Sequence, residues 1–290
     1  SSYHLAFQIA PCINAAGRME DPMIAFDMMM GDEDKALELR KLNMERQETV
    51  SSALTEAIEI AEQGLKNDPI LIMESKTWQP GIIGLIAGKL CERYGKPTIA
   101  LTLHNGKYVG SCRSIPEINI VEALSKHAEL FVGFGGHAQA AGLTIEPNKL
   151  DHLRSGLKAD IGKFLQKHPV EPSIFVDTEL LAQEISPHII DELKNLEPFG
   201  MGNPKPKFLL RNMKVLDLRT VGKDGSHLQL RLFDGKRIHK SIAFQFAEHA
   251  KTLQSWQHID LVCQLQKNEW NGRVSVDIQM VDARKAGGKK

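Results

Sequence analysis

A chain of 290 residues, of which 42% are hydrophobic, is long enough to form two domains with packed cores. No apolar run approaches the roughly 20 residues of a membrane span, and the N-terminus lacks the charged-then-apolar order of a signal peptide, so we expect a soluble, cytoplasmic protein. The four cysteines are widely spaced and form no CxxC pair, which argues against a disulfide framework and against structural zinc.

The formal net charge is zero, but the charges are unevenly distributed. Residues 20–68 contain thirteen acidic and five basic side chains, whereas residues 205–240 contain ten basic and three acidic ones. A basic segment of this kind is typical of proteins that bind nucleic acid, although a solvated basic face has the same composition. The candidate phosphate contacts in this segment are Arg211, Arg219, Arg231 and Lys236.

The first predicted elements are a loop and a long helix. Residues 9–18 contain Pro11, Asn14 and Gly17 and end at Arg18, a composition typical of a loop. The guanidinium of Arg18 has the fork geometry that matches phosphate oxygens, but a lone arginine is also a common surface charge. From residue 32 to 68, apolar residues recur at three, four and seven spacings among charged ones, which predicts one or two long helices that connect domains.

Strand and helix signals then alternate from residue 69 to 170, which predicts an α/β unit with a mixed sheet. The apolar run 70–73 is typical of a strand buried on both faces, and Asn105-Gly106 is a strong hairpin signal between two strands. The predicted elements are strands at 70–73, 98–103 and 107–113 and helices at 82–94, 119–130 and 148–168.

The segment Phe134–Gly142 contains Gly135-Gly136-His137. Two glycines let the backbone reach positive φ and leave N–H groups free to face an anion. The segment therefore predicts a phosphate-binding loop, although a tight turn beside a core histidine fits the same residues.

The last part of the chain has the strand order of an OB-fold barrel, whose usual ligands are single-stranded nucleic acids or oligosaccharides. A short helix at 185–196 and an irregular Pro/Gly stretch precede it. Phe233 and Phe244 each end an alternating apolar strand, which favours core positions over base stacking. The predicted strands are residues 207–218, 226–233, 237–244, 259–266 and 273–281, with a helix at 245–253 between the third and fourth.

Five segments carry further information when they are taken together and in order. They are APCINAAGRM at 10–19, WQPGIIG at 78–84, GSCRS at 110–114, GGHAQAAG at 135–142 and LEPFGMGNP at 196–204. These segments resemble the RecJ family of single-strand-specific 5′ exonucleases, within the DHH phosphoesterase superfamily. The resemblance implies four parts: residues 1–31 as the end of the catalytic DHH domain, 32–68 as a connecting helix, 69–170 as the DHH-associated domain and 171–290 as an OB domain.

The resemblance also implies site residues. His137 is expected to be catalytic, as a donor to the scissile phosphate, with Gly135 and Gly136 offering backbone N–H groups. Ser111 and Arg113, two apart on a predicted strand, point the same way, and the resemblance assigns them to a pocket for the 5′ phosphate. Arg18 and Asn14 are expected at the junction of two domains. Cys112 stands where the family often has glycine, which questions how closely a ligand can approach that backbone.

The sequence has no Asp-His-His motif and no cluster of Asp and His at metal spacing. The resemblance therefore implies that Mn²⁺ or Mg²⁺ binds to an N-terminal catalytic domain that is absent here, and we expect this fragment alone to bind no cofactor and to be inactive. The implied function is the substrate-binding part of a 5′ to 3′ exonuclease in DNA recombination and repair. Single-stranded DNA with a 5′ phosphate is the implied ligand, and single-strand-binding protein is the implied protein partner.

Two alternatives remain open at this point. One is a nucleic-acid-binding module without catalysis, and the other is a phosphodiesterase of the same superfamily that acts on short oligonucleotides. The OB domain argues against the second alternative, because a small nucleotide needs no barrel to track a strand.

Overall fold

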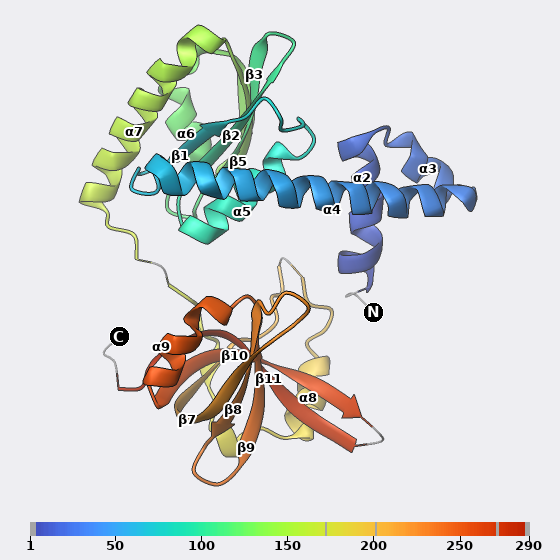
Figure 1. Cartoon of the computed structure of the whole chain (residues 1–290), viewed down its shortest axis with the longest axis vertical. Helices are drawn as coiled ribbons and strands as arrows, with labels where there is room; N and C mark the ends of the chain where they lie inside the picture. The colour runs from blue at the N-terminus through green and yellow to red at the C-terminus, as the bar shows by residue number, and fades with distance from the viewer. Residues whose placement is uncertain (1–3, 172, 201, 271–272, 288–290) are drawn as a thin grey trace. The chain divides into compact units, whose positions relative to one another are not determined.

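The computed structural model describes residues 4–171, 173–200, 202–270 and 273–287. The chain divides into two compact units, residues 1–172 and 173–290 (Figure 1). Within the described residues, none of the helices combines the length and apolar character needed to cross a membrane.

The first unit begins with helices, and residues 10–19 form α2 (Ala10–Met19) instead of the predicted loop. Pro11 lies in the first turn, where its missing N–H is tolerated, and Ala15 and Ala16 are fully buried in a small core with α3 (Met23–Met29) and α4. The loop prediction was wrong because this packing outweighs the local preference of Pro, Asn and Gly. The predicted long helix is α4 (Asp34–Ile60), followed by a π-helical turn at Ala61–Leu65.

A five-stranded sheet forms the centre of the first unit, in the order β1-β2-β3-β5-β4. β1 and β2 are parallel and the other pairs are antiparallel, so the predicted mixed sheet is confirmed. Asn105 and Gly106 both have positive φ, as the predicted two-residue hairpin turn requires. The strands are β1 (Leu71–Glu74), β2 (Thr98–His104), β3 (Lys107–Arg113), β4 (Phe131–His137) and β5 (Ala140–Ile145).

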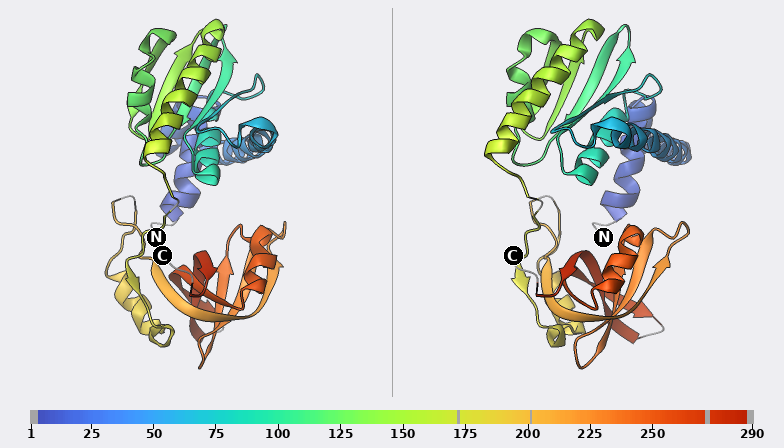
Figure 2. Two further views of the ribbon diagram at one scale, coloured as in Figure 1. Left: turned by 90° about the vertical axis from the view of Figure 1, so that its left-hand side faces the viewer. Right: turned by 60° about the vertical axis from the view of Figure 1, so that its left-hand side comes forward.

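Helices cover the two faces of this sheet unequally (Figures 1 and 2). On one face, α6 (Ile120–Ser125) and α7 (Leu150–Lys167) pack on a core that reaches from β1 to β5. On the other face, α5 (Ile83–Tyr94) contacts β2 and β3 and packs with α4 over β1 and β2. The second face of β4 and β5 stays exposed at Gly135, His137 and Gly142.

The second unit is the predicted OB barrel. Its strands follow the order β7-β8-β9-β11-β10, and pairing of β10 with β7 closes the barrel. β7 pairs with β10 along its first half and with β8 along its second half, and Asn212, at φ 53°, lies in the first half. The elements are β6 (Thr178–Glu179), α8 (Pro187–Lys194), β7 (Phe208–Val221), β8 (His227–Phe233), β9 (Ile238–Ala243), α9 (Ala250–Ser255), β10 (His258–Trp270) and β11 (Arg273–Lys285).

The expected core positions of Phe233 and Phe244 are wrong. Leu228, Leu230 and Leu232 of β8 are fully buried, so the two-residue period of the strand puts Phe233 on its outer side, where it is half-buried. Phe244 follows the end of β9 and is 48% exposed, with its ring edge-on to His227 at 5.2 Å between centroids. Both side chains therefore lie outside the barrel core, and the ring of Phe244 is the exposed one.

Candidate nucleic-acid interface

Three neighbouring strands of the first unit bring the predicted residues onto one face of the sheet. Residues paired across adjacent strands share a face, and so do residues two apart on one strand. The side chains of Ser111, Arg113 and His137 therefore lie on the face that α5 leaves open over β4 and β5. The two paired rows are Arg113, Ala140 and His137, and Ser111, Gly142 and Gly135.

The Gly-Gly-His segment is the end of strand β4 and not the predicted loop. It turns through Ala138 and Gln139 into β5, and β4 is the edge strand of the sheet. The small residues favoured the loop prediction, but their backbone pairs in register with β5.

The two glycines of this strand differ in what they require. Gly136 has φ 151°, and a Cβ there would overlap the carbonyl oxygen of Ala140 and lie 2.6 Å from the Cα of Ala141. A Cβ at Gly135 would meet no atom within 4 Å. Packing within the chain thus explains Gly136, whereas Gly135 leaves a bare stretch of backbone facing outward. The exposed His137 side chain has no hydrogen-bond or ion-pair partner within the described part of the chain.

Ser111 and Arg113 are half-buried and contact each other. One terminal nitrogen of Arg113 donates to Ser111 Oγ at 3.3 Å and to the carbonyl of Cys112 at 2.8 Å. A Cβ at Gly84 of α5 would lie 3.1 Å from Ser111 Oγ and 3.4 Å from Arg113, so a glycine lets the helix pass close over this pair. The pair predicted for the 5′ phosphate is thus present as a contact.

Cys112 does not obstruct this face. Its side chain points to the opposite side of the sheet, into the core under α6 and α7, and is fully buried. Burial raises the pKa of the Cys112 thiol to about 12, so it stays protonated at neutral pH. The departure from glycine at this position leaves the surface beside Ser111 and Arg113 unchanged.

Arg18 joins the same region from α2. Its terminal nitrogen donates to the carbonyl of Gly81 at 3.1 Å, just before α5, and a Cβ at Gly81 would overlap the Arg18 carbonyl oxygen. Burial lowers the pKa of Arg18, and the nearby positive charges of Arg46 and Arg113 lower it further. The positive charges of Arg46 and Arg113 thus act on Arg18, and none of the three guanidinium groups forms an ion pair with a carboxylate of the described residues.

Arg46, on α4, was missed by the sequence analysis. It donates to Asn43 Oδ1 at 2.9 Å, and its Nε is buried without a partner among the described residues. The only signal in the sequence is that Arg46 has no acidic residue three or four positions away on the helix. Lys41, in contrast, pairs with Glu45 four positions later. Arg40 shares this signal, so tertiary packing alone identifies Arg46.

Asn14 lies one helical turn before Arg18 and is exposed. Together with Gly17, Arg18 and Gly81 it lines a cavity of about 590 Å³ between α2, α3 and the loop before α5. The structure thus brings Asn14 and Arg18 to one cavity.

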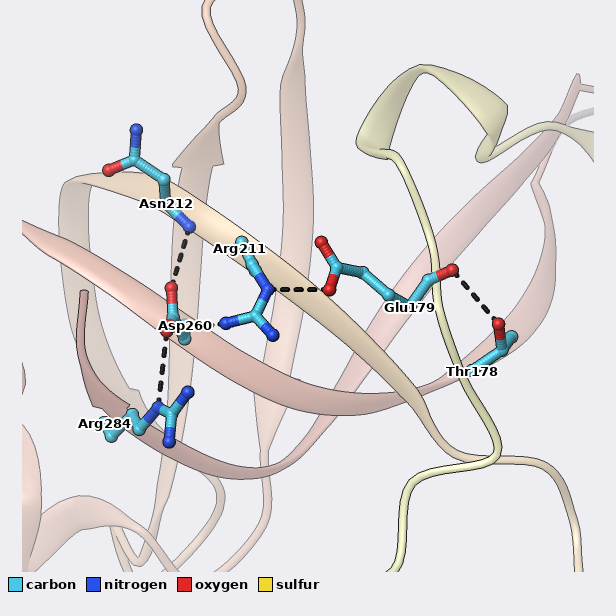
Figure 3. A network of polar contacts seen from close by, with 6 residues as sticks. All are labelled: Thr178, Glu179, Arg211, Asn212, Asp260 and Arg284. Carbon is cyan, nitrogen blue, oxygen red and sulfur yellow. Dashed lines mark hydrogen bonds and ion pairs between the residues drawn. The ribbon is translucent and has the colours of Figure 1, made fainter. Parts of the chain in front are cut away.

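The four basic candidates in the barrel do not form one group. Arg219 and Arg231 lie on the outer side of β7 and β8, where Arg219 bonds Gln229 and Arg231 pairs with Asp217 at 2.9 Å. Lys236 is exposed in the turn between β8 and β9. Arg211 lies where β7 pairs with β10 and is held by Glu179 at 2.7 Å and by Asp260 at 3.6 Å (Figure 3).

Asp234 stabilises the turn that presents Lys236. Its buried carboxylate accepts the backbone N–H groups of Lys236 and Arg237 at 2.6 Å each and pairs with His239 at 2.9 Å. Burial alone would raise the pKa of Asp234, but the bonds from Arg237, His239 and Lys236 outweigh it and lower the pKa to about 2. The charged form is therefore the one that stabilises the fold.

Asp234→Asn is expected to lower the free energy of unfolding by about 2 kcal/mol at pH 7. Because the folded pKa lies below the unfolded value of 3.8, this contribution is fully present above about pH 4 and is lost as pH falls toward 2. Urea denaturation between pH 7 and pH 3 measures the difference in free energy of unfolding between the wild type and the variant, and this difference should shrink below pH 4. A difference that does not change with pH would contradict this assignment.

No group of three or more His, Cys, Asp or Glu side chains that could hold a metal ion occurs in the part of the chain that the structure describes. The resemblance implies Mn²⁺ or Mg²⁺ on a separate N-terminal domain and not on these residues, and no chemical step is assigned to a metal on this chain.

Comparison with family models identifies both units. The model described as the DHHA1 domain matches residues 67–163, and the model described as the RecJ OB domain matches residues 176–282. The matched segments contain the Ser111, Arg113 and His137 face and, apart from the last three residues of β11, the five barrel strands.

Comparison with curated proteins and solved structures gives the same result. The single-stranded-DNA-specific exonuclease RecJ of Bacillus subtilis is 32% identical to this chain, and the alignment covers 96% of this chain and 36% of that protein. The protein of the same name from Thermus thermophilus is also 32% identical, and the alignment covers 97% of this chain and 40% of that protein. The crystal structure of Thermus thermophilus RecJ in complex with Mn²⁺ superposes with a TM-score of 0.83 at 27% identity, covering 99% of this chain and 42% of that one.

The chain spans half or less of the length of these curated relatives, 36% in Bacillus subtilis and 50% in Escherichia coli. Every curated relative named above is a RecJ protein, and the two family models match the first and the second unit of the chain. The chain therefore belongs to the RecJ family, and it corresponds to the part of that family that carries the DHHA1 and OB domains.

Proposed function

We propose that this chain binds single-stranded DNA and holds its 5′ phosphate at Ser111 and Arg113. The observation that carries the proposal is the contact of Arg113 with Ser111 at 3.3 Å on the open face of the sheet, where Arg113 has no acidic partner among the described residues. The positive charges of Arg46 and Arg113 also act on Arg18, which an anion would compensate, and the guanidinium fork matches phosphate oxygens in two-point contacts.

The surface beside this contact suits a strand of DNA. Gly135 and Gly142 are exposed, so a phosphodiester can approach the backbone of β4 and β5 without meeting a side chain. His137 lies in the same row as Arg113 and offers a ring N–H to a phosphate oxygen. In this proposal, His137 orients the scissile phosphate and the arginines neutralise its 5′ neighbour.

Hydrolysis itself is assigned to a metal centre outside this chain. The related Thermus thermophilus RecJ was crystallised with Mn²⁺ and with Mg²⁺. A divalent ion activates water and stabilises the charge that develops on the phosphate, and no side chains for that chemistry cluster within the described residues. The contribution of this chain to the proposed exonuclease is to select a free 5′ end and to position it.

The barrel would track the strand beyond that end. Arg219 and Arg231 share the outer side of β7 and β8, and Lys240 of β9 pairs in register with Arg231. Phe244, exposed beside His227, is available to stack on a base. Positive charge and an exposed ring on one face are typical of single-strand binding.

The test compares two 12-nucleotide single strands, one with a 5′ phosphate and one with a 5′ hydroxyl, both labelled at the 3′ end. In fluorescence anisotropy we expect the phosphorylated strand to bind at least about tenfold more tightly, because two charge-assisted contacts are lost without the phosphate. Affinity for both strands should fall steeply between about 50 and 200 mM salt. Equal affinity for the two strands would support a general binding module instead.

A further inference from the structure

On the side of the barrel where β7 pairs with β10, a cavity of about 770 Å³ is lined by Arg211, Asn212, Trp256, Gln257, His258 and Lys285. We call it the β7–β10 pocket. In the barrel order, β7 and β11 separate β10 from β8 and β9, so this pocket does not belong to the outer surface of Arg231 and Lys240. None of the contacts proposed above lies in this pocket. Among its lining residues, only Arg211 was a candidate phosphate contact, because it belongs to the basic segment 205–240.

The backbone around the β7–β10 pocket departs from regular structure at three points. Asn212 and Gln257 both have φ 53°, and they are two of the four non-glycine residues with positive φ in the described part of the chain. The register of β10 against β7 also shifts between Ile259 and Leu261, where Arg211 and Asn212 of β7 together oppose Asp260, which makes a bulge in β7. Left-handed residues and bulges cost free energy in a barrel and concentrate at binding sites.

Asp260 fixes the charged groups of this pocket. It is 4% exposed and accepts the backbone N–H of Asn212 at 3.1 Å and Nε of Arg284 at 3.3 Å, with Arg211 at 3.6 Å (Figure 3). Glu179 holds Nε of Arg211 at 2.7 Å. Arg211, which lines the pocket, is therefore held in place before any ligand arrives, which lowers the entropy lost on binding.

Two further groups at the rim have no carboxylate partner. Lys285 is exposed, His258 is half-buried, and neither forms an ion pair within the described residues. Trp256 is partly buried against the barrel core and is also one of the residues that line the pocket. The exposed side-chain amides of Asn212 and Gln257 stand beside it.

We infer that the β7–β10 pocket binds one nucleotide unit of a single strand, with its base on Trp256 and its phosphate at Lys285 and Arg211. An indole face stacks on any base, the amides pair with base edges, and the cations neutralise one phosphate. An acidic peptide would use the cations and the amides, but its Asp and Glu side chains offer no flat ring to the indole, which favours the nucleotide. The inference rests on single-stranded DNA as the ligand of the proposed function, but it needs no 5′ phosphate.

The test uses the full chain and a single-stranded 12-mer with a 5′ hydroxyl and one 5-iodouracil base, which crosslinks to aromatic side chains on illumination. Peptide mapping by mass spectrometry should find the crosslink on Trp256, and Trp256→Leu should abolish it. Lys285→Glu, a surface change that leaves the core intact, should reduce crosslinking at least about fivefold and lower the salt dependence of binding by about one phosphate contact. Crosslinks found only on Phe233 or Phe244 would overturn the inference.

Two controls separate this inference from the proposed function. Arg113→Ala should leave the Trp256 crosslink unchanged and remove the preference for a 5′ phosphate. Lys285→Glu should weaken the crosslink and leave that preference unchanged. If the 5′ phosphate preference is absent but the crosslink persists, the proposed function fails and the pocket stands. A glutamate-rich peptide that competes with the strand for the pocket at equal concentration would overturn the choice of a nucleotide.

Discussion

Gly136→Val is expected to lower the free energy of unfolding of the first unit by more than about 3 kcal/mol. Valine disfavours the φ of 151° at this position, and its Cβ would overlap the carbonyl oxygen of Ala140. Backbone strain of this kind costs about 1–3 kcal/mol, and forced movement of packed backbone adds a similar amount. Urea denaturation followed by circular dichroism measures the loss.

The matched control is Gly135→Val, one residue earlier on the same strand. A Cβ there meets nothing within 4 Å, so we expect a change in the free energy of unfolding of no more than about 0.5 kcal/mol. The same variant should bind single-stranded DNA less tightly, because its side chain would cover the bare backbone that the strand approaches. Similar destabilisation by both valines would show that the two glycines do not differ as described.

Arg113→Ala is expected to remove most of the preference for a 5′-phosphorylated strand. A hydrogen bond between charged groups contributes about 1.5–3 kcal/mol, so the affinity for the phosphorylated strand should fall by about 10- to 100-fold, and the affinity for the 5′-hydroxyl strand should change little. Arg113→Lys should be intermediate, because an ammonium keeps the charge without the fork. Anisotropy titrations with both strands measure the two affinities.

Lys163→Ala is the matched control for charge. Lys163 is exposed on α7, which covers the opposite face of the sheet, so its removal takes away one positive charge without touching the arginine group. It should leave the discrimination between the two strands unchanged. If Arg113→Ala lowers the affinity for both strands equally, Arg113 contributes only general positive charge and no recognition of the 5′ phosphate.

Much of the fold could be predicted because local patterns and tertiary packing agree there. The Asn105-Gly106 turn, the helix that ends before Gly95 and the succession of three strands, a helix and two strands in the barrel all rest on short-range signals that the structure keeps. The helix α2 could not be predicted in this way, since its stability comes from burying Ala15 and Ala16 against α3 and α4.

The candidate site was only partly predictable for the same reason. Ser111 and Arg113 stand two apart on one strand, so alternation alone puts them on one face. Their alignment with His137 depends on β5 lying between β3 and β4, and the approach of Arg46 to Arg18 depends on how α2 and α4 pack. Contacts of that kind join segments distant in sequence, and a single sequence has no local signal for them.

The edge position of β4 has a consequence for self-association. A free strand edge exposes unpaired N–H and C=O groups that can pair with the edge of another molecule. Three of the seven residues of β4 are glycines, which have low β propensity and give a second strand no side chains to pack against. The composition that keeps this surface open to a ligand therefore also makes the edge a poor template for edge-to-edge aggregation.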